Sequence, residues 1–341
     1  MDRIDATLVG ADGGWAAQVA HAAPADQATI VLVAGANDAF ALGLTVALCS
    51  ALRHLDATRS AEVFVLDGGL SPASRDRCRR CLARTRPDAA VTFCSTDSDR
   101  FDGFNDHGYT PAAYLRLLIP ELVPDRHRRA LYLDSDVVVE GDVARLWALP
   151  DEGKAFRAAL DDGIRGTSFV RDHLGFGGLA ADAPYFNSGV MLIDLRRWKA
   201  ARISERTLQV LAEHSDRCVH ADQDALNIAA AGNWSVLSSA WNRQFSGMNA
   251  WPQTDGAPNA PIGIIHFVDG KPWQPGTACL LQRNFNAALR DSGWLSTGAY
   301  LGFLARRKAR AARSAGSDWL RRRPALARVW DAIQGRRTAC G

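Results

Sequence analysis

Continuous apolar runs of strand length alternate with helix-like segments through the first 140 residues. The runs at residues 29–34, 62–67, 89–94 and 130–134 are rich in β-branched and aromatic side chains, and a polar or glycine-containing break follows each. Such runs are typical of strands that are buried on both faces of a parallel sheet and covered by helices. The pattern therefore predicts an α/β fold built on a single doubly wound, mostly parallel sheet.

The loop after the first expected strand has the position of a nucleotide-binding turn. Asn37 and Asp38 follow the apolar run, and helical spacing resumes over residues 39–52 with one of them as the N-cap. The N-terminus of a helix that follows a strand is a common binding position for phosphate groups. The loop lacks the glycine-rich dinucleotide fingerprint and the P-loop pattern, which excludes those two nucleotide sites.

The second half of the chain continues the alternation less regularly. Strands are predicted at residues 156–160, 185–194 and 262–266, and helices at residues 204–213 and 222–231. Hydrophobic residues make up 47% and charged residues 23% of the 341 residues, which excludes disordered and collagen-like classes.

The chain is expected to hold one enzyme-sized domain with two appendages. A loosely ordered leader covers residues 1–27, the α/β domain residues 28–290, and a basic C-terminal tail residues 291–341. No internal repeat divides the domain further.

Positive charge is concentrated in the tail. From residue 305 onward, eleven Lys/Arg face two Asp, a net charge of +9, whereas the whole chain carries only +3. Apolar residues recur at helical spacing between the arginines, at positions 319, 326, 330 and 333. This is the pattern of a basic amphipathic helix on an anionic membrane surface, in short pieces because Gly316 and Pro324 interrupt it. A solvated tail without a partner is the alternative, and no nucleic-acid motif accompanies the tail.

Cysteine usage and the N-terminus bear on the compartment. The seven cysteines are an odd number and widely scattered, which fits a reducing compartment. Cys78 and Cys81 have zinc-like spacing but no second pair, so helix residues are the preferred interpretation. Asp2, Asp5 and Asp12 interrupt any signal-peptide-like run. We therefore expect a cytoplasmic protein that lies peripherally at the inner face of the cytoplasmic membrane.

The densest candidate chemistry follows the strand at residues 130–134. Asp134 and Asp136 are two residues apart, so on a strand both side chains leave the same face. Oxygen ligands of this kind suit magnesium or manganese. An isolated Asp-x-Asp is also common in solvated turns, but two further residues add to the pattern. His266 ends another expected strand, and Lys271 supplies a cation that suits a metal-bound diphosphate.

Six motifs, taken in chain order, resemble the retaining glycosyltransferases of family 8, which include bacterial lipopolysaccharide galactosyl- and glucosyltransferases and glycogenin. The resemblance covers roughly residues 28 to 290, and it rests on the order of the motifs because each alone is weak. The motifs lie at residues 37–38, 114–117, 131–137, 186–190, 222–227 and 266–273.

The resemblance implies a GT-A fold, a UDP-sugar donor and a manganese ion, with magnesium as the alternative. It assigns the metal to Asp134, Asp136 and His266, and it places Lys271 against the diphosphate. The interval from His266 to Lys271 is one residue shorter than in the family's usual pattern.

The remaining donor contacts are implied in the same way. The loop at Asn37 and Asp38 would contact the uracil and ribose, although the family usually has an aspartate where Asn37 stands. Ser135 belongs to the donor site with its flanking aspartates. Gln223 would face the reacting anomeric carbon, and the donor sugar would be lined by Arg116, Asn187, Asp161, Asp222 and Gln223.

The function implied is transfer of a hexose, galactose or glucose, from a UDP-sugar to a glycan acceptor such as lipopolysaccharide or another cell-surface glycan. Retention of the anomeric configuration leaves two routes open. In one, the departing phosphate guides a front-side attack while Asp222 or Asp161 stabilises the sugar cation. In the other, a nucleophile first attacks the sugar on the face opposite the leaving group. Two other functions stay open. One is a non-catalytic UDP-sugar-binding relic of the same fold. The other is a haloacid-dehalogenase-type phosphatase, because residues 131–137 also resemble the nucleophile strand of that family.

Overall fold

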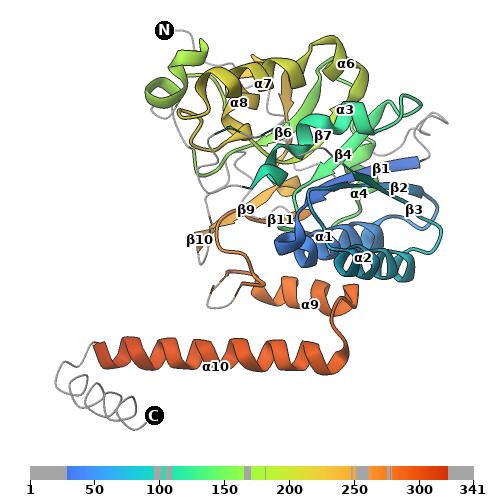
Figure 1. Ribbon diagram of the computed structural model, residues 1–341, viewed down its shortest axis with the longest axis vertical. Helices are drawn as coiled ribbons and strands as arrows, with labels where there is room; N and C mark the ends of the chain where they lie inside the picture. The colour runs from blue at the N-terminus through green and yellow to red at the C-terminus, as the bar shows by residue number, and fades with distance from the viewer. Residues whose placement is uncertain are drawn as a thin grey trace.

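The computed structural model describes most of the chain between residues 29 and 321 (Figure 1). The expected leader and the tail after Arg321 lie outside the described residues, and side chains of the last helix are described as far as Arg310. The described residues are 29–95, 101, 103–104, 110–164, 170–180, 182–246, 249–250, 261–274, 277 and 279–321.

A large sheet of seven strands forms the centre of the molecule, in the order β3-β2-β1-β4-β7-β6-β8. Six of its strands run in one direction, and only β7 is antiparallel to both of its neighbours. The prediction of a mostly parallel sheet is therefore confirmed. The strands are β1 (Thr29–Ala36), β2 (Ser60–Asp67), β3 (Ala90–Ser95), β4 (Arg129–Leu133), β6 (Phe156–Leu160), β7 (Phe186–Asp194) and β8 (Trp234–Val236).

A second, four-stranded sheet in the order β10-β9-β11-β5 was not anticipated from the sequence. In it β11 is antiparallel to β5 and parallel to β9. The chain leaves β4 of the large sheet and enters β5 of the small sheet through residues 134–136, so this turn joins the two sheets. The strands are β5 (Val137–Val139), β9 (Arg243–Ser246), β10 (Asn249–Ala250) and β11 (Ile264–Phe267).

Helices enclose the sheets in two groups (Figure 1). In the first group, α1 packs against β1, β5, α2 and α9, which explains why it is apolar on nearly all sides and almost completely buried. In the second group, α8 packs on β7 and α7. The groups are α1 (Ala41–His54), α2 (Pro72–Thr85) and α9 (Gln282–Ser292), and α6 (Leu195–Ala200), α7 (Ile203–His214) and α8 (Asp222–Ala230).

Shorter segments complete the layers. A 3-10 segment, Pro111–Leu118, follows Thr110 and continues into α3 (Ile119–Leu122). A further short helix, α4 (Val143–Trp147), follows β5. Cys78 and Cys81 are buried residues of α2, and all cysteines of the described residues are free thiols.

The C-terminal helix α10 (Thr297–Arg321) is continuous and extends away from the body (Figure 1). It passes through Gly316, so the expected break there is wrong. A glycine costs about 1 kcal/mol in a helix, and the neighbouring alanines and arginines are strong helix formers. The helix starts on the body, where Tyr300 and Phe303 pack on the apolar cluster of β11 and α9. None of the helices in the described residues is long and apolar enough to cross a bilayer.

Candidate active site

The aspartate turn is anchored on both sides by neighbouring strands. The Asp134 amide donates to the Gly189 carbonyl of β7 at 2.8 Å. The Phe267 amide of β11 donates to the Asp136 carbonyl at 3.0 Å. The two carboxylates are therefore held at the edge where the parallel strands of the large sheet end.

Asp134, Asp136 and His266 form the cluster of potential metal ligands found in the described residues. Their ligand atoms lie within 4.8 Å of one another. His266 stands opposite Val137 in the β11–β5 pairing, which brings its Nε2 to 3.3 Å from Asp136 Oδ1 and 3.9 Å from Asp134 Oδ2. Two carboxylates and one imidazole at this spacing fit a divalent cation such as manganese.

The orientation of the His266 ring is set by Asn242, a fully buried residue that the sequence analysis missed. Asn242 Nδ2 donates to Asn187 Oδ1 at 2.9 Å, so its Oδ1 faces His266 Nδ1, also at 2.9 Å. Nδ1 must then carry the proton, which leaves the lone pair of Nε2 directed toward the carboxylates. This is the usual arrangement behind a metal-ligating histidine.

Gly189 leaves room for the cluster. A Cβ at this position would lie 2.3 Å from His266 Cε1 and 2.9 Å from Asp134 Oδ2. Any larger residue would therefore displace two of the three candidate ligands.

Lys271 is the cation closest to Asp136 in the described structure. Its Nζ donates to Asp136 Oδ2 at 2.6 Å and to the carbonyls of Phe267 and Val268 at 2.9 and 3.0 Å. Burial opposes ionisation of Asp136, but Lys271 and His266 together hold the pKa of this carboxyl below its ordinary value.

Arg116, from the 3-10 segment before α3, links the aspartate turn to α8. Its guanidinium lies 3.1 Å from Asp134 Oδ1 and 2.9 Å from Asp222 Oδ2. It also donates to the carbonyl and hydroxyl oxygens of Ser188. Although burial acts in the opposite direction, these two carboxylates raise the pKa of Arg116, so the group stays charged.

Asp222 begins α8 directly after a strained residue. Ala221 has φ 49° and ψ −122°, a conformation unusual for a residue with a side chain. Burial raises the pKa of Asp222 to about 7, even though Arg116 acts to lower it. Asp222 is therefore close to its titration point at neutral pH.

Gln223, in the first turn of α8, is half-buried and reaches residues at the ends of β6 and β7. Its Nε2 donates to Asp161 Oδ2 at 3.0 Å and to the Tyr185 hydroxyl at 3.1 Å, while its Oε1 accepts from the Ser188 amide at 3.0 Å. Asp161 Oδ2 also accepts from Asn187 Nδ2 at 3.0 Å. The structure thus joins Gln223, Asp161 and Asn187 in one network with Arg116 through Ser188.

The first loop lies beside the aspartate turn but is not bonded to the cluster in the described structure. Asp38 Oδ1 accepts from the Ser71 amide at 2.9 Å, and hydrogen bonds from Ser74 and Ser71 lower the pKa of Asp38. Asn37 Oδ1 is buried without a hydrogen-bond partner in the described residues.

Close packing holds this loop near the turn. A Cβ on Gly43 of α1 would meet the Ser135 carbonyl at 2.4 Å and the Trp273 ring at 2.5 Å. The Phe40 ring packs edge-on against Trp273 at 5.7 Å between centroids. Ser135 therefore borders the start of α1, next to the candidate nucleotide loop.

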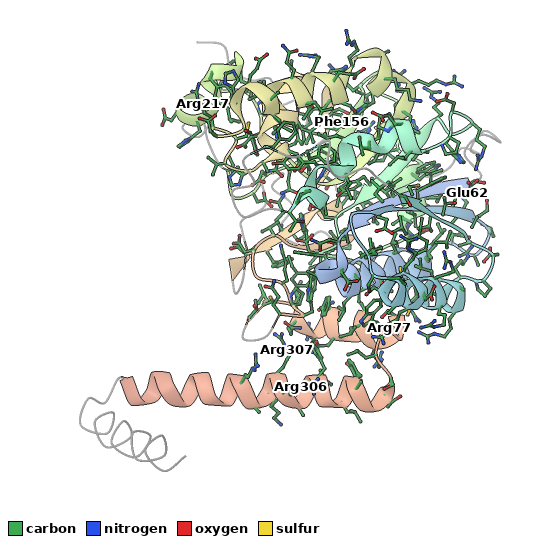
Figure 2. The ribbon with its side chains drawn as sticks, viewed as in Figure 1. Glu62, Arg77, Phe156, Arg217, Arg306 and Arg307 are labelled. Carbon is green, nitrogen blue, oxygen red and sulfur yellow. The ribbon has the colours of Figure 1, made fainter. Side chains whose placement is uncertain are left out.

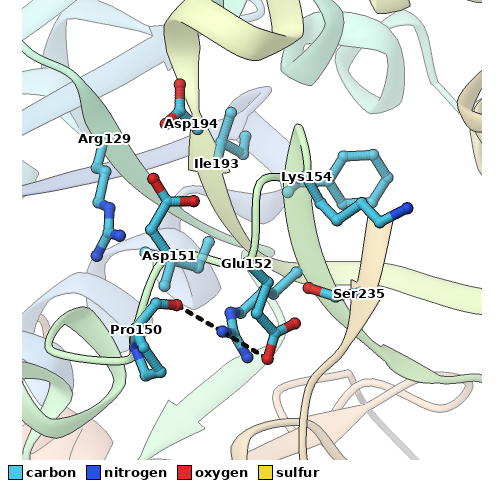
Figure 3. A pocket seen from close by; sticks show the side chains of 11 residues that line it. Arg129, Pro150, Asp151, Glu152, Lys154, Ile193, Asp194 and Ser235 are labelled. Carbon is cyan, nitrogen blue, oxygen red and sulfur yellow. Dashed lines mark hydrogen bonds and ion pairs between the residues drawn. The ribbon is translucent and has the colours of Figure 1, made fainter. Parts of the chain in front are cut away.

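A separate hollow lies at the opposite end of the large sheet (Figure 3). Arg129, Asp151 and Asp194 line it among other residues, and it contains none of the predicted site residues. Its charges are largely paired, as Arg157 is with Glu152 at 2.9 Å. This hollow therefore offers no competing site.

Solved structures resemble this arrangement of helices and strands. The galactosyltransferase LgtC in complex with donor and acceptor sugar analogues has a TM-score of 0.66 at 24% identity, covering 80% of this chain and 100% of that one. An LgtC active-site mutant with glutamate in place of a glutamine gives 0.65 at 25% identity, with 79% and 98% covered. The fold is that of a GT-A glycosyltransferase. The chain belongs to glycosyl transferase family 8, whose family model matches residues 31–276.

Curated relatives agree with the family. General stress protein A of Bacillus subtilis is 29% identical over 263 residues, 72% of this chain and 88% of the relative. The lipopolysaccharide 1,3-galactosyltransferase of Salmonella typhimurium is 30% identical over 193 residues, 54% of this chain and 56% of the relative. The lipopolysaccharide glucosyltransferase WaaO of Escherichia coli is 32% identical over 172 residues, 48% and 50% of the two chains. The chain thus spans about half the length of these two lipopolysaccharide enzymes.

Proposed function

We propose that this chain is a retaining, metal-dependent transferase that moves a hexose from a UDP-sugar to a glycan acceptor. The observation that carries the proposal is the approach of Asp134, Asp136 and His266 to one point beside Lys271. Galactose and glucose are the favoured sugars, and lipopolysaccharide or another cell-surface glycan the favoured acceptor, because relatives carry these names.

The residues of the cluster fit a manganese or magnesium ion. The two carboxylates and His266 Nε2 would hold it, with Asn242 and Gly189 keeping the ring in place. When bound, such an ion acts as a Lewis acid that stabilises the charge of the departing diphosphate. Lys271 adds a second positive charge on the same side of the site.

Donor recognition is divided between two parts of the rim. The Asn37 Oδ1, which has no hydrogen-bond partner among the described residues, would be an acceptor for the uracil or ribose. Asp38, whose carboxylate accepts a hydrogen bond from the Ser71 amide before α2, and Ser135 border the same side of the candidate site. On the other side, the Gln223 amide would face the transferred sugar, linked to Arg116 through Ser188 and to Asn187 through Asp161.

The hydrogen bonds of the carboxylates favour front-side attack guided by the departing phosphate. Asp161 Oδ1 accepts from the Gly163 and Ile164 amides, and its Oδ2 from Asn187 and Gln223. Asp222 is paired with Arg116. Both oxygens of Asp161 and one oxygen of Asp222 are therefore engaged, which disfavours these carboxylates as nucleophiles.

Mutation of the metal ligands tests the proposal. Asp134→Ala and Asp136→Ala should abolish manganese-dependent release of UDP from a UDP-sugar while the protein stays folded, because both side chains lie at the rim and not in the core. Thr58→Ala, on an exposed loop, is a matched control. Full turnover by either aspartate variant in EDTA would overturn the metal assignment.

A non-catalytic UDP-sugar-binding relic is the remaining alternative, because Asn37 departs from the family's pattern. The intact ligand cluster favours an enzyme. A wild-type protein that binds UDP with manganese but never releases UDP from any UDP-hexose would establish the relic. The phosphatase interpretation loses its support, since the chain belongs to family 8.

The basic tail is proposed to hold the enzyme peripherally at the cytoplasmic face of an anionic membrane. Arg306, Lys308 and Arg310 are exposed on α10, and each basic residue near such a surface contributes about 1 kcal/mol. Replacing all three by Glu should abolish sedimentation with phosphatidylglycerol vesicles and leave UDP-sugar hydrolysis unchanged. Equal vesicle binding by the variant and the wild type would refute this role.

A further inference from the structure

Arg307 of α10 forms hydrogen bonds with the body of the protein, and its side chain points away from the exposed side of the helix (Figure 2). It shares one face of α10 with Tyr300 and Phe303, both of which pack on the apolar cluster of β11 and α9. Its exposed neighbour Arg306 lies on the same helix without this packing. The basic tail therefore contains one arginine whose surroundings differ from those of a membrane-facing residue.

The guanidinium of Arg307 donates to three backbone carbonyls and to one side-chain oxygen. Its NH1 donates to the carbonyls of Pro272 at 2.6 Å and Gln274 at 3.1 Å. Its NH2 donates to the Thr277 carbonyl at 2.5 Å and to Gln282 Oε1 at 2.7 Å. The planar fork of an arginine can reach several carbonyls at once, whereas a lysine cannot reproduce this geometry.

Two of these carbonyls, those of Pro272 and Gln274, lie in the turn that carries Lys271. The Gln274 amide donates to the Lys271 carbonyl at 3.0 Å, which closes the turn from Lys271 to Gln274. The Gln282 side chain, at the start of α9, donates to the Pro272 carbonyl at 3.2 Å. Two of the carbonyls within this turn or at its end are thus bound by Arg307.

We infer that Arg307 is a positioning residue for donor binding: the tail helix fixes the turn from which Lys271 reaches the diphosphate of the nucleotide-sugar. This inference rests on the proposed function of the site. It assigns to α10 two separable roles, since Arg307 faces the donor turn while Arg306, Lys308 and Arg310 are exposed. The helix is then a part of the donor site as far as Arg307.

Binding measurements on the full chain test this assignment. Arg307→Ala should weaken UDP binding in saturating manganese by about tenfold to a hundredfold, the usual effect of losing one well-placed charged hydrogen bond. Manganese alone should bind no more weakly than in the wild type, because Arg307 touches none of the three ligands and loosening Lys271 only relieves its competition for Asp136. Arg307→Lys should recover part of the loss, and Arg306→Ala, one residue away and exposed, should have no effect.

A double-mutant cycle separates positioning from general stability. If Arg307 acts through Lys271, then Arg307→Ala should change UDP affinity by less than about twofold in a Lys271→Met background. An additive loss in that background, or equal losses of manganese and UDP binding in Arg307→Ala, would mean a merely structural role and overturn the inference. Unchanged UDP affinity in Arg307→Ala would do the same. If the wild type itself fails to bind UDP with manganese, the proposed function falls, and the inference with it.

Discussion

Replacing Lys271 should change metal affinity and nucleotide affinity in opposite directions. In the described structure its ammonium occupies Asp136 Oδ2 at 2.6 Å, and the two side chains are only 14% and 11% exposed. A cation that binds Asp136 must compete with this ion pair. Lys271→Met keeps most of the apolar stem, removes the competing charge and leaves the carboxylate free.

The size of the effect follows from the geometry of the pair. Two unit charges 2.6 Å apart attract by roughly 6 kcal/mol at an effective dielectric constant of about 20. Desolvation offsets most of this, so a hydrogen bond between charged groups retains about 1.5–3 kcal/mol. Because Lys271 can move aside and keep its two carbonyl contacts, we expect the lower end, which is about tenfold tighter manganese binding in Lys271→Met.

Two titrations read the two affinities separately. Electron paramagnetic resonance of free manganese measures metal binding without nucleotide, and calorimetry in saturating manganese measures UDP binding, which should weaken at least tenfold. Lys308→Met removes the same charge from an exposed position of α10 and should alter neither. Weaker or unchanged manganese binding in Lys271→Met would refute the competition.

Three further predictions concern the network around the cluster. Asn242→Leu should weaken manganese binding, measured by titration, about tenfold. This is near the lower limit for losing a hydrogen bond behind a metal ligand, because packing against Gly189 still confines the His266 ring. Unchanged affinity would contradict the tautomer assignment. The folded protein holds the proton of Asp222 up to about pH 7, so the stability from this group is complete below pH 3.8 and is lost as pH rises to 7. Denaturant titrations between pH 4 and 7 should therefore show that the unfolding free energy of metal-free Asp222→Asn depends on pH with a slope more positive than that of the metal-free wild type, by up to about 1.4 kcal/mol per pH unit. An unaltered slope argues against the raised pKa. Gln223→Ala should lower kcat about a hundredfold with little change in UDP affinity; parallel losses would make Gln223 a nucleotide contact.

The parallel strands made much of the site predictable from the sequence. Asn37 and Asp134 follow β1 and β4, which are parallel neighbours. Their carboxyl ends must then meet at one edge of the sheet, where ligands of such folds bind. His266 could be added because it ends an apolar run, and the order of the motifs linked it to the aspartates.

The direction of β7 could not be predicted in the same way. All nine of its residues are buried, so the strand lacks the alternation of polar and apolar positions that would mark a face. It runs antiparallel to β4 and β6, and this brings its first residues to the edge where β4 ends. Asn187 and Gly189 reach the site for that reason alone.

Long-range partners explain what the sequence analysis missed. Asn242 acts through His266, 24 residues away, and Asn187, 55 residues away. No local pattern marks a buried asparagine of this kind. Arg307 left a weak signal, because it follows Tyr300 and Phe303 at helical spacing, but it was one of eleven basic residues in the tail.

The turn between the two sheets has a consequence for how the protein unfolds. Asp134 directly follows β4 of the large sheet, whereas Asp136 directly precedes β5 and His266 lies within β11 of the small sheet. An ion bound to all three is a removable cross-link that closes a loop of about 130 residues, and such a link opposes the separate unfolding of either sheet. Amide exchange in β9 and β11 should therefore be faster than in β1 and β4 without metal, and manganese should bring both sheets to a common rate set by global unfolding.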